Sequence, residues 1–262
     1  STKNCTINNV TNDPSINGAT ATCKNVTIGD GVVTLVNATG ARLDVYGSYT
    51  NTGTVNQNDA ILRAIDGGAA TSQSLTSSST ITNFEIEKTG GGTVSITGTS
   101  VTINNLTYKP GNTGVISVSS GKTLILPNGV SIPNGTMDIV GGATLNIGNG
   151  SSITLNGGTF QTSGTHDQYP QNLSAKGKIT VNGAGTWGFT ATSGTLSLVG
   201  FVIDYIDTNG LNVGGSTNLT NLRGGHFTNL SQSYASVKVM QFNTASVPAS
   251  PADVEWYWGP NN

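Results

Sequence analysis

The sequence predicts an all-β fold, a right-handed single-stranded parallel β-helix, which is a solenoid of short stacked strands. Apolar and small polar residues alternate with period two in run after run, as in "TVSITGTSVTINNLTYK". Gly, Asn or Pro closes each run after a few residues, and these residues favour the backbone conformations of tight turns. No segment shows the 3.6-residue period over the length of a helix. The chain is therefore expected to form many very short strands.

A sandwich or barrel also contains many short strands, so the spacing of the turns decides between the architectures. Turn residues recur every six to ten residues, and residues 136–158 nearly repeat themselves. The inward positions expected in this repeat are Ile139, Leu145, Ile147, Ile153 and Leu155. The repetition favours a solenoid of about 10–12 rungs, each of roughly 18–25 residues and rising about 4.8 Å.

The strand-bearing segments follow one another along the chain. Residues 25–47 hold three short alternating runs, separated by "GDG" and "NATG". Residues 80–88 continue the alternation, and residues 122–132, 177–183 and 194–206 repeat it. Asn residues that follow several of these runs tolerate the left-handed turns that corners require. Each segment is therefore expected to supply part of one or two rungs.

Three segments leave the pattern. Residues 67–80 and 162–177 are polar and aperiodic, so both predict loops inserted between rungs. Residues 243–262 hold three of the eight prolines and predict an irregular C-terminal tail. We expect one β-helix domain over residues 1–262, with an N-terminal cap region at residues 1–25 and further protein after the tail.

Charged residues make up only 9% of the chain, against about 25% in typical soluble domains. Thr, Ser and Asn take their places, so hydroxyl and amide groups provide the solubility, as expected of an extracellular β protein. The net charge is −2 and the 11 basic residues are scattered, which argues against nucleic-acid binding. No hydrophobic run approaches the roughly 20 residues of a transmembrane helix. We expect an exported protein whose leader has been removed.

The chain contains two cysteines, Cys5 and Cys23. A disulfide between them would close a loop of 17 intervening residues and contribute roughly 3 kcal/mol on the chain-entropy estimate. Two reduced, buried thiols are the alternative. We expect the disulfide, because both residues lie beside strand-like segments and the composition indicates an oxidising compartment.

Two stretches, "CKNVTIGDGVVTLVNATGARLDVYGSYTNTGTVN" and "TITNFEIEKTGGGTVSITGTSVTINNLTYK", resemble the runs of bacterial secreted right-handed parallel β-helix repeat proteins. The resemblance covers residues 23–242 at the level of pattern. It implies a secreted or cell-surface protein of repetitive architecture, such as an adhesin, fibre or envelope component, and it carries over no catalytic residue. Pectate lyases and polygalacturonases share the fold, but fold does not transfer function.

Few residues in the sequence are candidates for chemistry. A glycosidase needs two carboxylates across the scissile bond. Glu85 and Glu87 are two apart in an expected strand and share a face, where we expect them to be solvated. Asp204, Asp207 and Asn209 lie near a Gly and are candidates for a Ca²⁺ site, with turn formation as the alternative. We expect no metal site, no cofactor and no enzymatic activity.

Aromatic residues are only 6% of the chain, and they cluster. Trp256, Tyr257 and Trp258 are contiguous, and Trp187 lies in "GTWGFT". Flat aromatic faces stack on the apolar C–H surfaces of sugars, so these four residues are candidates for ligand binding. The alternative for the tail cluster is a cap that shields the last rung.

The sequence thus predicts a non-enzymatic structural or adhesive module of a bacterial surface protein or filament. Its Thr, Ser and Asn wall is expected to bind by many weak contacts, or its ends to assemble with other copies. The expected partners are a surface glycan or the protein itself, with no nucleic acid and no membrane span. The alternative is a polysaccharide-binding or polysaccharide-active β-helix protein.

Overall fold

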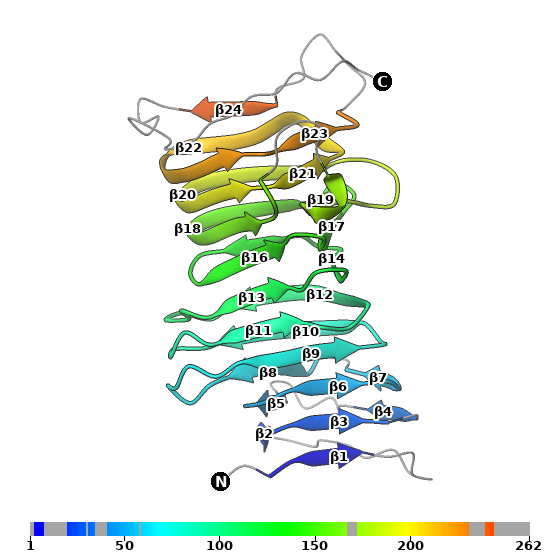
Figure 1. Ribbon diagram of the computed structural model, residues 1–262. Coiled ribbons are helices and arrows are strands. Elements are labelled where there is room, and N and C mark those ends of the chain that lie inside the picture. Colours follow the sequence, from blue (N-terminus) through cyan, green and yellow to red (C-terminus); the bar gives the residue numbers. More distant parts are fainter. Residues whose placement is uncertain are drawn as a thin grey trace.

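The protein is a parallel β-solenoid of about 9 turns in the computed structural model, which describes residues 3–7, 20–29, 31–34, 41–57, 59–166, 172–230 and 239–243. The strands stack in chain order from β1 at one end to β22 and β24 at the other (Figure 1). Every strand pairing in the described residues is parallel, so each rung lies directly on the rung before it. The expected fold class is confirmed.

Two long sheets form the walls of the solenoid, and a third sheet of two strands lies beside the first rungs. The 12-stranded sheet contains β1 (Cys5–Ile7), β3 (Val26–Ile28), β6 (Tyr49–Asn51), β9 (Gln73–Ser77), β11 (Thr93–Ile96), β13 (Val115–Val118), β15 (Val130–Ile132), β16 (Thr136–Val140), β18 (Ser152–Ser163), β20 (Trp187–Val199), β22 (Ile206–Arg223) and β24 (Met240–Asn243). The 10-stranded sheet contains β2 (Thr20–Cys23), β5 (Arg42–Val45), β8 (Ile61–Ile65), β10 (Ile81–Glu87), β12 (Ser100–Tyr108), β14 (Thr123–Leu126), β17 (Thr144–Gly148), β19 (Gly177–Asn182), β21 (Phe201–Asp204) and β23 (His226–Thr228). The short sheet pairs β4 (Val32–Thr34) with β7 (Thr54–Asn56).

Successive rungs place equivalent residues 21 to 26 positions apart along most of the 12-stranded sheet. The rung that links β18 to β20 is much longer, because Thr162 and its partner Leu198 are 36 positions apart. This rung includes the short 3₁₀ helix η1 (Leu173–Ala175) and the loop around it. The long rung explains in part why the turns are fewer than the about 10–12 that the sequence predicts.

The period-two alternation forms the core, because every second side chain of a strand points inward and stacks on its equivalents in neighbouring rungs. All five residues expected to point inward in the repeat of residues 136–158 are fully buried, which confirms that interpretation. One such apolar column of the 12-stranded sheet consists of Val94, Ile116, Met137, Phe160, Leu196 and Leu219. Each buried side chain of this size contributes roughly 1.5–3 kcal/mol relative to exposure.

The corners depend on Gly and Asn, as the sequence predicts. A Cβ at Gly148 would lie 1.8 Å from the carbonyl oxygen of Pro127, so no other residue fits there without a shift of the backbone. Asn side chains also stack between rungs at one corner. The Asn128 amide donates to Asn105 and the Asn105 amide donates to Asn83, both at 3.0 Å. These amides bond rung to rung outside the core.

The loop expected at residues 67–80 is wrong in its second half, because Gln73–Ser77 forms strand β9. Leu75 is the apolar core residue of this strand, whereas Gln73 and Ser77 occupy inward positions with polar side chains. The Gln73 amide donates to the carbonyl oxygens of Val45 and Ile65, at 2.9 and 2.8 Å. Hydrogen bonds therefore replace apolar packing at the positions where the alternation is lost.

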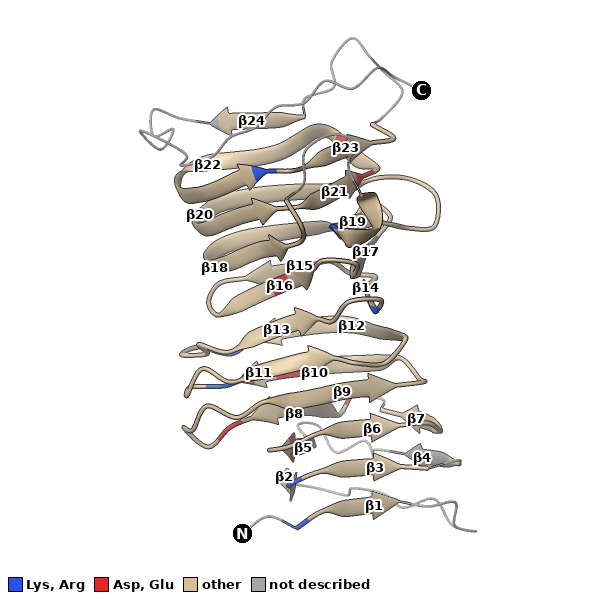
Figure 2. Ribbon diagram, in the orientation of Figure 1, with Lys and Arg blue, Asp and Glu red and all other residues tan. Residues whose placement is uncertain are grey.

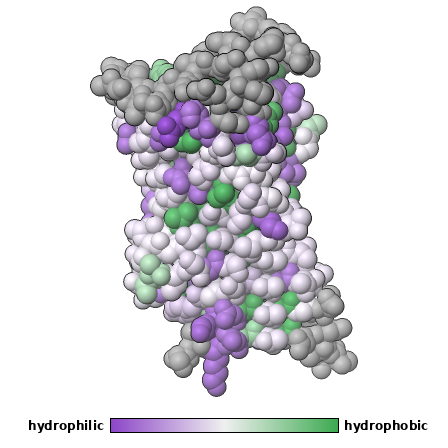
Figure 3. Space-filling view, in the orientation of Figure 1, coloured by the Kyte–Doolittle hydropathy of each residue, from purple (hydrophilic) through white to green (hydrophobic). Residues whose placement is uncertain are grey.

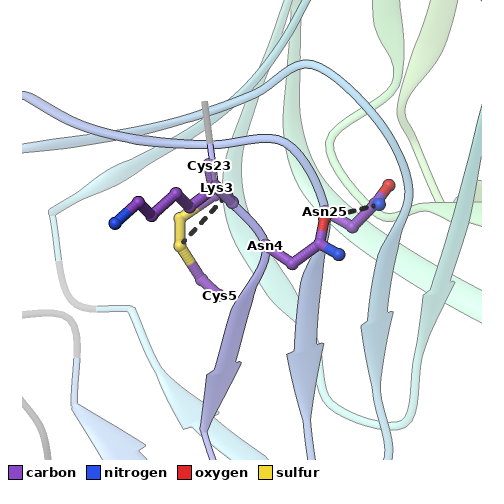
Figure 4. The surroundings of a disulfide bond; sticks show 5 residues. All are labelled: Lys3, Asn4, Cys5, Cys23 and Asn25. Carbon is purple, nitrogen blue, oxygen red and sulfur yellow. Dashed lines mark hydrogen bonds between the residues drawn. A yellow bond between two sulfur atoms is a disulfide. The ribbon is translucent and has the colours of Figure 1, made fainter. Parts of the chain in front are cut away.

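The predicted disulfide between Cys5 and Cys23 is confirmed (Figure 4). It joins β1 of the 12-stranded sheet to β2 of the 10-stranded sheet, with the two Cα atoms 5.8 Å apart. Beside it, the Asn25 amide donates to the Asn4 side chain at 2.9 Å. The disulfide and this amide pair fix the first rung onto the second.

Candidate functional site

The aromatic residues proposed for ligand binding divide into two groups. Trp187 is only 1% exposed, and its indole N–H donates to the carbonyl oxygen of Asp204 at 2.8 Å. The ring is therefore part of the core, and the stacking face expected at this position is not on the surface. Trp256, Tyr257 and Trp258 lie outside the described residues.

Asp204, at the end of β21, is the centre of a polar cluster near the C-terminal end of the solenoid. Its Oδ1 accepts hydrogen bonds from Thr228 at 2.9 Å and Asn229 at 2.8 Å. Its Oδ2 accepts from Thr180 at 3.2 Å and lies 3.1 Å from the Lys178 ammonium. Burial favours a higher pKa for this carboxyl, but the bonds from Asn229, Lys178 and Thr228 and the Lys178 charge hold the pKa below its ordinary value. Asp204 is thus an ionised, fully partnered carboxylate.

The calcium candidates do not form one ligand set. Asp204 is occupied by the partners just described, whereas Asp207 bonds within its own strand, β22. The backbone N–H of Asn209 donates to the Asp207 carboxylate at 2.9 Å. The described residues contain no group of three or more His, Cys, Asp or Glu side chains placed to hold a metal ion. The turn-forming interpretation accounts for Asp207 and Asn209.

Columns of polar side chains, most of them hydroxyl groups, cover the outer wall of the 12-stranded sheet. Parallel register places equivalent outward residues directly above one another. One column consists of Thr6, Thr27, Thr50 and Thr76. A second column consists of Ser74, Ser95, Ser117, Asp138, Gln161, Ser197 and Asn221. We call these two columns together the hydroxyl wall; the face drawn in Figure 3 is mostly of intermediate hydropathy, with few strongly apolar patches.

Hydrogen bonds between rungs fix side chains on this wall. The hydroxyls of Thr76 and Thr97 are 3.0 Å apart. The Ser163 hydroxyl donates to Asp138 at 2.9 Å, and the Asn221 amide donates to Ser197 at 3.0 Å. A surface whose side chains are ordered in this way loses less conformational entropy when it binds a partner.

A row of charged residues crosses the outer wall of the 10-stranded sheet at β5, β8 and β10, in a molecule that otherwise shows few charges (Figure 2). The parallel register places Asp44, Arg63 and Glu85 at equivalent positions in three successive rungs. Arg63 forms a bidentate pair with Asp44 at 2.7 and 2.9 Å and also pairs with Glu87. Burial favours a lower pKa for Arg63, but the Asp44 bond and the nearby carboxylates raise it overall.

The two glutamates that the sequence places on one outer face, Glu85 and Glu87, both form ion pairs in this region. Glu87 pairs with Arg63, and Glu85 lies 3.5 Å from the Lys109 ammonium. Both glutamates are partly exposed, as expected for an outer wall. Each carboxylate has a cationic partner, and neither faces the other across an open cleft in the described residues.

Sequence reasoning missed a buried lysine. Lys88 is 0% exposed, and its ammonium donates to the carbonyl oxygen of Thr71 at 2.9 Å. Burial lowers the pKa of Lys88 to about 8, and the charge of Asp66 partly opposes this effect. Asp66 in turn accepts from the backbone N–H groups of Gly68 and Gly90, each at 2.9 Å. In "FEIEK" this lysine looks like a solvated strand end, so only the packing reveals it.

The comparisons with known proteins give no identification. No family model matches this chain, and neither a curated protein nor a solved structure shows significant similarity to it. Among the described residues, no helix has the length and apolar character needed to cross a membrane. The functional interpretation therefore depends on the surfaces of the solenoid itself.

Proposed function

We propose that this protein is a non-enzymatic extracellular module of structural or adhesive function, which binds a repetitive surface glycan through its hydroxyl wall. The observation that supports this most strongly is the register of the wall, since Thr6, Thr27, Thr50 and Thr76 stack in four successive rungs. A single hydroxyl contact is weak. Equally spaced contacts on a stiff support reinforce one another, because each contact raises the effective concentration of the next.

The covalent and ionic features support the same function. The disulfide at Cys5 and Cys23 is typical of proteins from oxidising compartments. Three carboxylates that could serve an acid–base reaction, Asp44, Glu85 and Asp204, are each in an ion pair. Their pairing favours a structural role over acid–base catalysis. An adhesin-like protein of a bacterial surface fits this set of properties.

Retention on insoluble polysaccharide tests the wall. The purified protein is incubated with cellulose and chitin particles and with peptidoglycan sacculi, and the bound fraction is measured beside the triple variant Thr27→Val, Thr50→Val and Thr76→Val. Valine keeps the β-branched shape that suits a strand and removes only the hydroxyl. We expect the variant to lose most of the retention with an unchanged circular dichroism spectrum. Equal retention of both proteins contradicts binding through the wall, and no retention on any particle contradicts the adhesive function.

Assembly end to end is the structural form of the same proposal. Heterologous contacts that do not close a ring produce filaments. Sedimentation velocity over a range of protein concentrations tests this form directly. A series of species that grows with concentration supports it, and a monomer at all concentrations leaves adhesion through the wall as the function to test.

A further inference from the structure

The corner between β21 and β22 has an exposed aromatic side chain in a conformation that aromatic residues rarely adopt. Tyr205 has a φ of 57°, in the left-handed region. Of the described residues with positive φ, only Tyr205 and Asn229 are not glycine. The Tyr205 side chain is not there to fill the core, because the residue is 40% exposed. A backbone outlier that local packing does not explain points to a function at that position.

The strand that follows this corner contains a bulge. Ile206 of β22 pairs with Trp187, and Leu211 pairs with Phe189, so residues 207–210 lie opposite Gly188 alone. Bulges of this kind change the direction of side chains and are common beside binding sites. Within the bulge, Thr208 and Asn209 are exposed. An exposed hydroxyl and an exposed amide therefore lie three and four residues after Tyr205 in the chain.

Hydrogen bonds to neighbouring rungs hold this corner in place. The backbone N–H of Tyr205 donates to the carbonyl oxygen of Thr228 at 3.3 Å, and the carbonyl oxygen of Tyr205 accepts from the backbone N–H of Trp187 at 3.2 Å. The Trp187 indole bonds to Asp204, whose carboxylate in turn binds Lys178. These contacts tie the residues before and after Tyr205 to the neighbouring rungs, which reduces the entropy that a ligand would have to remove.

We propose that this corner binds a sugar ring of a neutral polysaccharide, with the Tyr205 ring as the stacking platform and Thr208 and Asn209 as hydrogen-bonding groups. An exposed aromatic ring with exposed polar groups three and four residues further along the chain is suited to a pyranose ring, since the sugar presents C–H groups on one face and hydroxyls at its edge. A neutral sugar fits better than an acidic one, because the Lys178 ammonium is already paired with Asp204. The site is separate from the hydroxyl wall and does not depend on it.

Substitution of Tyr205 separates binding from stability. In Tyr205→Gly the strained position receives the residue that tolerates positive φ, so we expect the midpoint of thermal unfolding to rise by about 2–4 °C. The same variant loses the ring, so we expect its affinity for the sugar to fall at least tenfold. Tyr205→Phe keeps the ring, and its affinity should stay close to that of the native protein. Phe242→Ala, which removes another 40% exposed aromatic ring, is the matched control and should not change binding.

Binding is measured by saturation-transfer NMR and calorimetry with soluble cello-, xylo-, manno- and chito-oligosaccharides, and with polygalacturonate as the acidic comparison. Binding of a neutral oligosaccharide that Tyr205→Gly loses and Phe242→Ala keeps supports the site. No binding of any neutral oligosaccharide, equal binding by Tyr205→Gly, or binding of polygalacturonate alone overturns it. The triple wall variant is measured in parallel. If it binds oligosaccharide normally but is not retained on particles, the corner and the wall are separate sites.

Discussion

The buried lysine gives the sharpest prediction for stability. Because Lys88 has a lower pKa in the folded protein, the folded state binds fewer protons than the unfolded state between about pH 8 and about pH 10.5. The free energy of unfolding therefore rises with pH across that window, and at neutral pH the protein has none of this gain. The shift from 10.5 to about 8 corresponds to about 3 kcal/mol at 1.36 kcal/mol per pKa unit.

The variant Lys88→Met isolates this effect. Methionine fills a similar volume without a charge, so its pH dependence lacks the contribution of Lys88. Urea unfolding, followed by circular dichroism from about pH 7 to about pH 10, gives the free energy of unfolding of both proteins. We expect the difference between native and variant to move by about 2–3 kcal/mol in favour of the native protein over this pH range, because part of the full shift develops only above about pH 10.

Other groups titrate in the same range, but they are present in both proteins. Burial raises the pKa values of Tyr49 and Tyr108, and their effects cancel in the difference between the two curves. Thr71→Val is the matched control, because it removes the hydroxyl beside the ammonium but leaves the lysine in place. Parallel curves for the native protein and Lys88→Met would refute the reasoning, since they would show that Lys88 has the same pKa in both states.

Three further predictions concern other parts of the solenoid. Arg63→Met removes the bidentate partner of buried Asp44, but Arg42 remains 2.9 Å from the same carboxylate, so we expect the free energy of unfolding to fall by about 1.5–3 kcal/mol. Lys109→Met, at a partly exposed pair, should cost less than about 1 kcal/mol; equal losses in urea unfolding would contradict this. Cys5→Ser should lower the free energy of unfolding by roughly 3 kcal/mol, and a reductant should destabilise the native protein but not the variant. Asp204→Asn should destabilise the protein at neutral pH and flatten the loss of stability below about pH 4, because the lowered pKa makes this carboxylate stabilising above that pH; acid unfolding measured by tryptophan fluorescence checks it.

The period-two pattern was sufficient to predict the walls of the solenoid, because core formation requires an apolar residue at every second position. It failed where the inward residue is polar. Gln73 and Ser77 occupy core positions in β9, and hydrogen bonds satisfy both side chains. A sequence shows the polarity of such residues but not their partners. The loop expected there was therefore too long.

The candidate site was harder to predict from the sequence, although the sequence already contained evidence against an exposed Trp187. Trp187 and Phe189 are two residues apart in a strand, so they share a face, and the buried Phe189 indicates that this face is the core. The alternation itself argued against an exposed Trp187. Tyr205 had no such signal, because "FVIDYI" places it in step with inward Phe201 and Ile203. Only its positive φ turns the side chain outward, and the sequence gives no indication of that conformation at a non-glycine residue.

The few charges of this chain have a role that follows from its repetition. Rungs of similar length and similar polar walls specify their neighbours weakly, so a strand can pair with the wrong rung at little cost. Arg63 lies between acidic residues in the rungs on both sides, Asp44 below and Glu85 above. Such an arrangement is satisfied in only one order of rungs. A displaced pairing would take Arg63 away from Asp44, which is 5% exposed and would then keep only Arg42 of its own strand as an ionic partner. We therefore expect the charged row to favour this order of the rungs in the half of the solenoid that contains it, while the apolar columns supply most of the stability.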